Sequence, residues 1–181
     1  MATTGTIYDE TVKFGPAKLL ASATISSPVA VVSFPSVVSS GIAVYHIDIM
    51  LNVGSAGAYL CAQTTDSGGA TWSNTYYQVH GYYTQTGAGG DTTTFNTTSQ
   101  LQISHACYDG LKAEMMLFIR GGSANQGHSN WHSCCYAGPT YGLGHLYGSG
   151  GYSGVSGVRF YFSVGNIASG FIRVYGMRIG T

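Results

Sequence analysis

Two segments of this chain alternate apolar and polar side chains so regularly that they constrain its fold more than any other feature. In residues 42–53 (IAVYHIDIMLNV), one set of alternate positions holds Tyr45, Ile47, Ile49, Leu51 and Val53. The intervening positions hold His46, Asp48 and Asn52, together with Met50. Residues 111–120 (LKAEMMLFIR) repeat the pattern with Leu111, Ala113, Met115, Leu117 and Ile119. Because neighbouring side chains of a strand point to opposite faces, both segments are predicted as strands with one face in a core.

Further apolar runs, each bounded by Gly, Pro, Ser, Thr or Asn, are also predicted as strands. They span 20–25, 29–34, 58–63, 76–83, 99–104, 130–136, 158–164 and 171–177. Residue propensities allow a helix over Tyr108–Arg120, but the alternation favours a strand. Nine or ten short strands without intervening helices predict an all-β fold, an antiparallel β-sandwich that is jelly-roll-like.

The end of the chain is expected to form a hairpin, with the strands 158–164 and 171–177 joined by the loop 165–170. A length of 181 residues predicts one domain. We assign residues 17–181 to a single β-sandwich domain and residues 1–16 to an N-terminal arm or first edge segment.

Charged residues make up only 8% of the chain and the formal net charge is zero, whereas ordinary soluble domains hold about 25% charged residues. A basic surface for nucleic acid is therefore not expected. So weakly charged a surface provides little repulsion between copies, which predicts a protein that works in an assembly as a homo-oligomer.

The chain shows neither a secretory signal nor an apolar stretch of the roughly 18 residues that a membrane span requires. Synthesis in a cytoplasm is therefore expected. Its cysteines, Cys61, Cys107, Cys134 and Cys135, are accordingly expected to be reduced and buried.

No sequence motif for catalysis or for a cofactor is present, so we expect no catalytic residue, no cofactor and no enzymatic activity. The best metal-binding candidate is the segment HSNWHSCC, where a strand would place His128, His132 and Cys134 on one face. His128 is about 13 Å from His132 along a strand, which leaves His132 and Cys134 as a minor hypothesis for one ion. Polar residues on a solvent-exposed or subunit face are the favoured interpretation.

The Gly-rich stretch 138–157 is expected to be a loop that carries Tyr141, Tyr147 and Tyr152. A flexible surface loop is the simplest interpretation. The alternative is an adaptable contact surface, because tyrosine offers a large amphipathic area and glycine a pliable backbone. These three tyrosines are the candidate ligand or partner contacts.

The closing segment, VRFYFSVGNIASGFIRVYGMR, resembles the C-terminal signature of jelly-roll virion proteins of tailed bacteriophages. The matching residues are Val158, Arg159, Phe160, Phe162, Gly165, Asn166, Ile167, Ala168, Ser169, Gly170, Ile172, Tyr175 and Gly176. The clear match covers about the last 20 residues, the first half matches loosely, and residues 85–157 match nothing in that group.

The resemblance implies a non-enzymatic structural protein of a phage virion, made in the host cytoplasm and assembled as a homotrimer with other virion proteins. The leading role is a tail-fibre or tail-tip module that contacts the host surface and a host-surface glycan. The alternative is a capsid decoration (cement) protein that stabilises the head shell. A free carbohydrate-binding or hydrolytic module is a third class.

Overall fold

The computed structural model describes residues 17–38, 42, 44–65, 68–72, 76–82, 94–104, 106–119, 127–135, 138–146 and 155–177. Of these, residues 76–82, 94–98, 119, 127–128, 135 and 138–146 are described by their backbone alone. The described residues form strands and turns and contain no helix. No helix long and apolar enough to cross a membrane occurs in this part of the chain.

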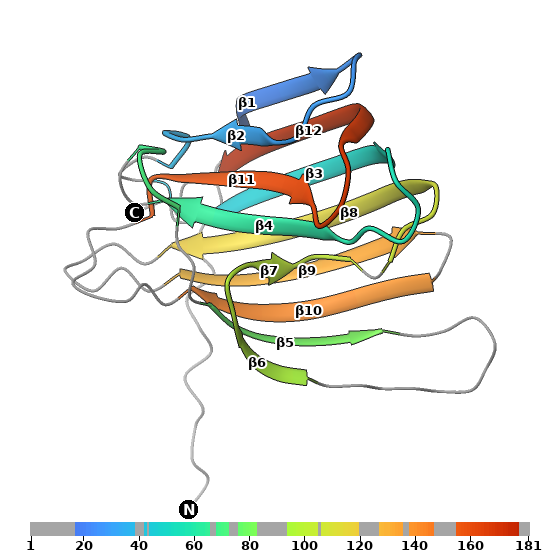
Figure 1. The fold of residues 1–181 in the computed structure, drawn as a ribbon. Helices are drawn as coiled ribbons and strands as arrows, with labels where there is room; N and C mark the ends of the chain where they lie inside the picture. Colours follow the sequence, from blue (N-terminus) through green and yellow to red (C-terminus); the bar gives the residue numbers. More distant parts are fainter. Residues whose placement is uncertain are drawn as a thin grey trace, which may run out of the picture.

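Two antiparallel sheets of unequal size pack against each other (Figure 1). The larger sheet has the order β1 (Lys18–Ile25), β12 (Ile167–Met177), β3 (Val44–Val53), β8 (Gly110–Ile119), β9 (Gly127–Cys135), β10 (Gly138–Leu146), β5 (Tyr76–Tyr82), β6 (Thr94–Thr98). The smaller sheet has the order β2 (Val32–Phe34), β11 (Gly157–Phe162), β4 (Leu60–Thr65), β7 (Leu101–Gln102). The predicted all-β sandwich is therefore confirmed, while its assignment as a jelly roll stays a prediction.

The core lies between the sheets, and the alternation seen in the sequence determines which side chains enter it. From β3 and β8 it receives Tyr45, Ile47, Ile49, Leu51, Leu111, Ala113, Met115 and Leu117. From the smaller sheet it receives Val32, Phe34, Leu60, Ala62, Val158, Phe160 and Phe162. Each large apolar side chain buried in this way contributes about 1.5–3 kcal/mol of transfer free energy. The strand predicted over 111–120 is confirmed against its helical alternative.

Strand β4 is buried over its whole length, although its sheet is the smaller of the two and has only one face against the core. Its inward side chains reach the core, and polar contacts cover its outward side chains. Gln63 Nε2 donates to the Ser99 carbonyl at 2.7 Å, and Thr65 Oγ1 donates to the Thr71 carbonyl at 2.5 Å. Polar residues can be buried here because their hydrogen bonds are satisfied.

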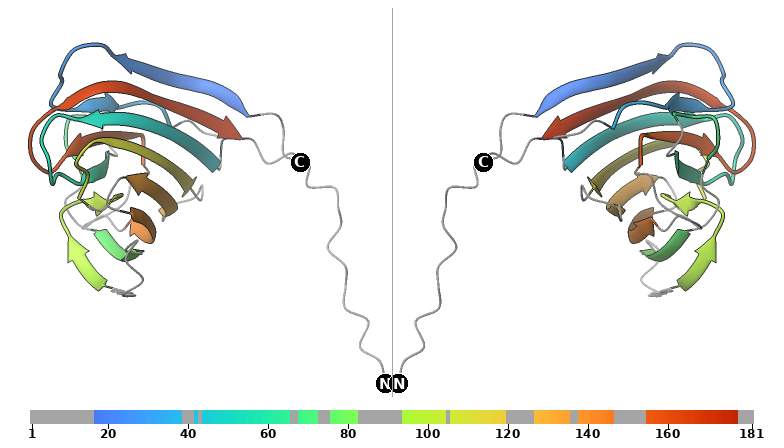
Figure 2. Two further views of the ribbon diagram at one scale, coloured as in Figure 1. Left: turned by 90° about the vertical axis from the view of Figure 1, so that its right-hand side faces the viewer. Right: turned by 90° about the vertical axis from the view of Figure 1, so that its left-hand side faces the viewer.

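The expected C-terminal hairpin is wrong. Strand β11 pairs with β2 and β4, whereas β12 pairs with β1 and β3, so the two closing strands lie in different sheets (Figure 2). The turn 163–166 carries the chain across the sandwich. Gly165, at φ 75°, adopts the backbone conformation that glycine favours. Alternation along each strand cannot distinguish a hairpin from such a crossing, because both place apolar residues toward one core.

The expected loop over 138–157 is also wrong in its first half, because Gly138–Leu146 form β10 between β9 and β5. Glycine weakens the local preference for a strand, yet pairing on both sides supplies backbone hydrogen bonds that outweigh it. Strand β6 was likewise not predicted. The N-terminal arm, residues 1–16, lies outside the described residues.

Candidate functional site

Of the residues predicted to contact a ligand, only Tyr141 falls on the described chain. It lies on β10, where its backbone pairs with Gly81 on one side and His132 on the other. Tyr147 and Tyr152 lie outside the described residues. Tyr141 therefore belongs to the sheet and not to a loop.

The predicted metal ligands His132 and Cys134 lie two residues apart on β9, and both side chains are exposed. The strand register places Glu114 beside His132 and Lys112 beside Cys134. In the described part of the chain, no group of three or more His, Cys, Asp or Glu side chains has an arrangement that could hold a metal ion. The metal hypothesis thus acquires no third ligand among these residues.

The expectation that all cysteines are buried is wrong for Cys134, which is exposed, whereas Cys61 and Cys107 are buried. These three are free thiols. Burial raises the pKa of the Cys61 thiol to about 12, because the thiolate is disfavoured away from water. Cys61 is therefore a protonated, inert core residue and is no candidate nucleophile.

Exposed aromatic side chains gather at one end of the sandwich, where the connections 54–59, 103–109 and 163–166 meet. We call this region the tyrosine end, after Tyr59 and Tyr108. These two side chains are 38% and 59% exposed, and Val164, in the third connection, is 63% exposed. The three connections lie together at the right-hand end of Figure 1.

Backbone hydrogen bonds join the three connections of the tyrosine end into one unit. Cys107 N donates to the Ala58 carbonyl at 2.8 Å, and Gly57 N donates to the Cys107 carbonyl at 2.8 Å. Ser163 N donates to the Tyr59 carbonyl at 2.9 Å, and Tyr59 N donates to Ser163 Oγ at 3.1 Å. Ser163 thus holds the backbone of Tyr59, and Cys107 holds the backbone of the preceding residues Gly57 and Ala58.

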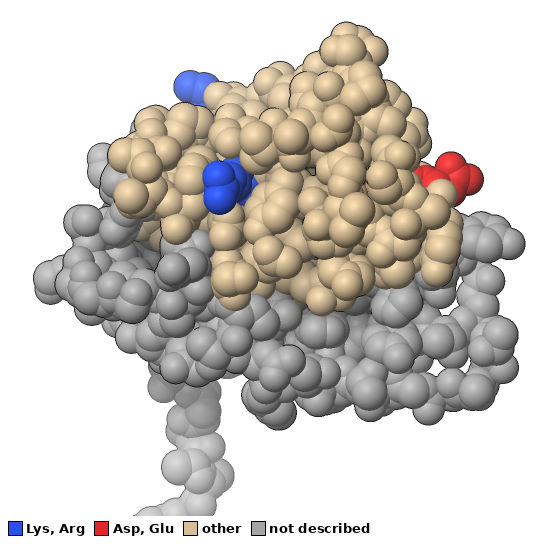
Figure 3. Space-filling view, in the orientation of Figure 1, with Lys and Arg blue, Asp and Glu red and all other residues tan. Residues whose placement is uncertain are grey.

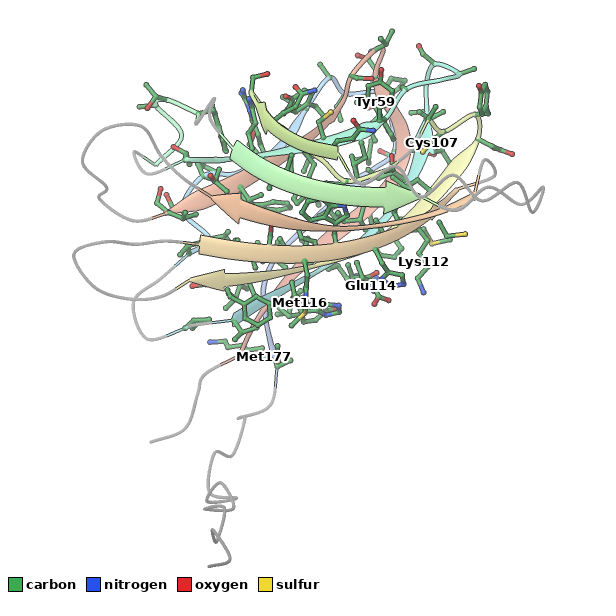
Figure 4. The ribbon with its side chains drawn as sticks, turned by 90° about the horizontal axis from the view of Figure 1, so that it is seen from below. Tyr59, Cys107, Lys112, Glu114, Met116 and Met177 are labelled. Carbon is green, nitrogen blue, oxygen red and sulfur yellow. The ribbon has the colours of Figure 1, made fainter. Side chains whose placement is uncertain are left out.

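Buried residues beneath this end fix its position. Ala58 and Cys107, the bridged pair, are fully buried. Ser104 Oγ accepts a hydrogen bond from Leu60 N at 2.8 Å and lies 3.3 Å from Cys107 Sγ. Because side chains alternate along each segment, Tyr59 and Tyr108 both emerge on the solvent side of this bridge. Figure 4 labels Tyr59 and Cys107 at this end of the molecule.

Two residues with hydrogen-bonding side chains lie in the connections that form the tyrosine end. Asp109 and Asn166 are exposed at the same end, and their backbone carbonyls accept hydrogen bonds from Val53 N at 3.1 Å and Gly54 N at 2.9 Å. A carboxylate and an amide at the same end of the molecule as two exposed aromatic rings can bind a neutral, hydroxyl-rich ligand through ring stacking and hydrogen bonds. The site therefore suits recognition of a sugar.

A second aromatic cluster lies on the outer side of the smaller sheet, around Arg159. Its guanidinium lies 4.6 Å from the centroid of Trp72 and 5.7 Å from that of Tyr161. Arg159 Nε donates to Gln63 Oε1 at 2.8 Å, and Tyr161 Oη donates to Gln100 Oε1 at 2.6 Å. These contacts are made within the chain, so we interpret the cluster as a structural latch that holds Trp72 against the sheet.

Few of the described residues on the side of the molecule that carries this latch are charged, as Figure 3 shows. This agrees with the low charge content of the whole chain. The described residues of this side therefore give a strongly charged ligand little electrostatic attraction.

Sequence reasoning missed the tyrosine end. The segments GAYLC and HACYDG each contain an exposed tyrosine next to a small buried residue, which is a weak local signal. That residues 58 and 107 pair could not be inferred from either segment alone.

No family model, no curated protein and no solved structure matches this chain.

Proposed function

We propose that this chain is a non-enzymatic structural protein of a tailed-phage virion, and that its tyrosine end contacts a glycan on the host surface. The observation that carries the proposal is the pair of exposed tyrosines, Tyr59 and Tyr108, on a hydrogen-bonded support. The resemblance of the closing segment to virion proteins supplies the setting. The tail-fibre or tail-tip role is favoured over capsid decoration because the exposed rings are a recognition feature.

A glycan is the ligand class that this chemistry favours. Sugar rings present C–H faces that pack on aromatic rings, and their hydroxyl groups pair with carboxylate and amide oxygens. Preorganisation by the backbone hydrogen bonds reduces the entropy lost on binding. The low charge content of the chain favours a ligand that is neutral or weakly charged.

Binding without hydrolysis is favoured by the same site. Most glycoside hydrolases place two carboxyl groups about 5–9.5 Å apart across the scissile bond. Among the described residues, Asp109 is the carboxylate that the tyrosine end contributes. One carboxylate can bind a hydroxyl group but cannot divide the acid and base roles.

The experiment is a binding measurement on an array of bacterial surface polysaccharides, with the full chain carrying a fluorescent label. We expect Tyr59→Ala and Tyr108→Ala each to weaken binding about 3- to 10-fold, because an aromatic contact contributes about 0.5–1.5 kcal/mol. Tyr59→Phe and Tyr108→Phe keep the rings and should stay within about 3-fold of wild type. Lys18→Ala, at an exposed position at the far end of β1 from the tyrosine end, is the control.

Unchanged binding by the double alanine variant would refute the site, and failure of the wild type to bind any glycan would refute the recognition role. Binding of the wild type to head shells that lack this chain would instead favour decoration. Release of sugar fragments from a polysaccharide would favour the hydrolytic class.

A further inference from the structure

A second surface, separate from the tyrosine end, is formed by the face of the larger sheet that turns away from the smaller one. We call it the outer face. Lys112, Glu114 and Met116 project from this side of β8 in Figure 4. Met50 on β3 is 55% exposed and Phe118 on β8 is 37% exposed. The outer face thus combines apolar side chains with charged ones.

The charges of the outer face balance. Arg173 and Lys112 are its described cations, and Asp48 and Glu114 are its described anions. A strongly acidic or basic partner would gain no net attraction from such a face. A partner that carries both positive and negative charges in a matching pattern would be attracted to this face. A second copy of this chain is such a partner.

The strand register places three of these charges in one row. Arg173 on β12 lies opposite Asp48 on β3, which lies opposite Glu114 on β8. Like charges directly opposite on neighbouring strands are destabilising. Glu114 has a counter-charge, since its Oε1 lies 3.8 Å from Lys112 Nζ.

Asp48 has no such counter-charge. Among the described residues it forms no ion pair, although Arg173 is its cross-strand neighbour. The Arg173 guanidinium lies instead over the Phe171 ring, 4.3 Å from its centroid. Asp48, a half-buried anion beside a second anion, and Arg173, an exposed cation one strand away, remain available for pairing with another molecule.

We infer that the outer face pairs with a second copy of the chain about a two-fold axis that runs along the strands between β12 and β3. Such an axis places Arg173 of each copy over Asp48 of the other. It forms two equivalent ion pairs, because a two-fold interface repeats every contact. Packed sheets lie about 10 Å apart, a gap that long side chains from both faces can fill.

The same axis brings the apolar residues of the outer face together. Phe171 of one copy lies over Met50 of the other, because the two residues are cross-strand neighbours like Arg173 and Asp48. Tyr175 likewise lies over His46, its neighbour within the chain. Moving the axis one strand, to between β3 and β8, would place Asp48 over Glu114 and oppose two anions. Charge therefore selects the first position.

The area is sufficient for a weak dimer. Four strands with four outward rows each cover about 500 Å² in projection, from a strand spacing of about 4.8 Å and a two-residue rise of about 6.8 Å. Side-chain relief raises the accessible area above that projection, toward the roughly 800 Å² per partner of a standard interface.

The direction of the axis has a functional consequence, which rests on the proposed glycan recognition. Rotation about an axis along the strands leaves the ends of the sandwich pointing the same way. Both tyrosine ends of the pair would then face one host surface and bind it bivalently. An axis across the strands would point them in opposite directions.

Sedimentation velocity of the full chain at 1–50 µM tests the pairing, independently of any glycan. We expect a species of twice the 19.0 kDa of the chain. Asp48→Arg and Arg173→Asp should each raise the dimer dissociation constant at least 10-fold, while the double swap should restore it to within about 3-fold of wild type. The charge reversal Asp109→Arg, at the tyrosine end and off the outer face, is the matched control and should leave dimerisation unchanged.

A wild-type monomer over this range overturns the inference. So does a trimer, the state expected from the sequence, because three-fold symmetry cannot place a patch on itself. The position of the axis is overturned if the dimer persists in both Asp48→Arg and Arg173→Asp. It is also overturned if the double swap of these two residues fails to restore the dimer. Circular dichroism of each variant establishes that it is folded.

A second measurement uses the wild type alone and so needs no folded variant. Hydroxyl-radical footprinting should oxidise exposed Met50 at least 3-fold more slowly at 50 µM than at 1 µM, while Tyr108, at the free end, keeps its rate. The pairing is contradicted if Met50 and Tyr108 are protected from oxidation equally, or if neither residue is protected. Protection of Met50 at 1 µM by the chain's own residues 1–16, shown by its independence of concentration, would identify the arm as the occupant and also overturn it.

Discussion

Substituting Gly170 tests how closely β12 and β3 approach each other where the last strand enters the larger sheet. Gly170 has φ 131°, and an added Cβ would lie 2.1 Å from the Met50 carbonyl oxygen and 2.8 Å from Leu51 Cα. The strained backbone costs about 1–3 kcal/mol, and crowding in a packed region costs about 1–3 kcal/mol more. We expect Gly170→Ala to lower the free energy of unfolding by about 4 kcal/mol, within those ranges.

Gly57→Ala separates the two contributions. Gly57 has a similar conformational demand, at φ 80°, but its Cβ would meet nothing within 4 Å. Only strain remains, at about 1–2 kcal/mol. Urea unfolding of both variants and the wild type measures the difference. In a chain of this size, 1 kcal/mol shifts the melting temperature by about 2–4 °C, so thermal unfolding should agree. If the two variants lie within about 1 kcal/mol of each other, given those costs, the close approach at Gly170 is refuted.

Two further predictions concern the smaller sheet. Arg159→Met should lower the free energy of unfolding by about 2–3 kcal/mol, because the stacking is lost and Gln63 Oε1 loses its donor. The control Lys18→Met, at an exposed position, should change the free energy of unfolding by less than about 0.5 kcal/mol. Equal effects of the two variants in urea unfolding would argue against the latch. Cys61 keeps its proton to a higher pH when folded, since its pKa rises from 9.0 to about 12. Its stabilisation is therefore complete below pH 9 and declines by about 1.4 kcal/mol per pH unit above it. The stability difference between wild type and Cys61→Ala should shrink accordingly from pH 9 to pH 11; a constant difference would contradict this.

Local alternation was enough to predict which side chains of β3 and β8 enter the core. Tyr45 and Met115 are buried as expected, while Met50 and Lys112 are exposed. This succeeds because the period of a strand is a property of consecutive residues. Phe160 and Phe162 alternate with Arg159 and Tyr161 in the same way, and both are buried.

What the sequence could not reveal depends on pairing between distant segments. The separation of β11 and β12 into two sheets is decided by their neighbours, and strand β10 exists because β9 and β5 flank it. The tyrosine end requires Ala58 to meet Cys107. Neither local propensity nor periodicity specifies such a meeting, so the candidate site moved from the Gly/Tyr loop to an end built from three connections.

Immuno-electron microscopy of purified phage particles, with an antibody to this chain, tests the central proposal most directly. Host recognition predicts label at the end of the tail. Label spread over the head would contradict that role and favour a decoration protein. Particles without label would contradict the virion proposal altogether and return the carbohydrate-binding and hydrolytic classes to consideration.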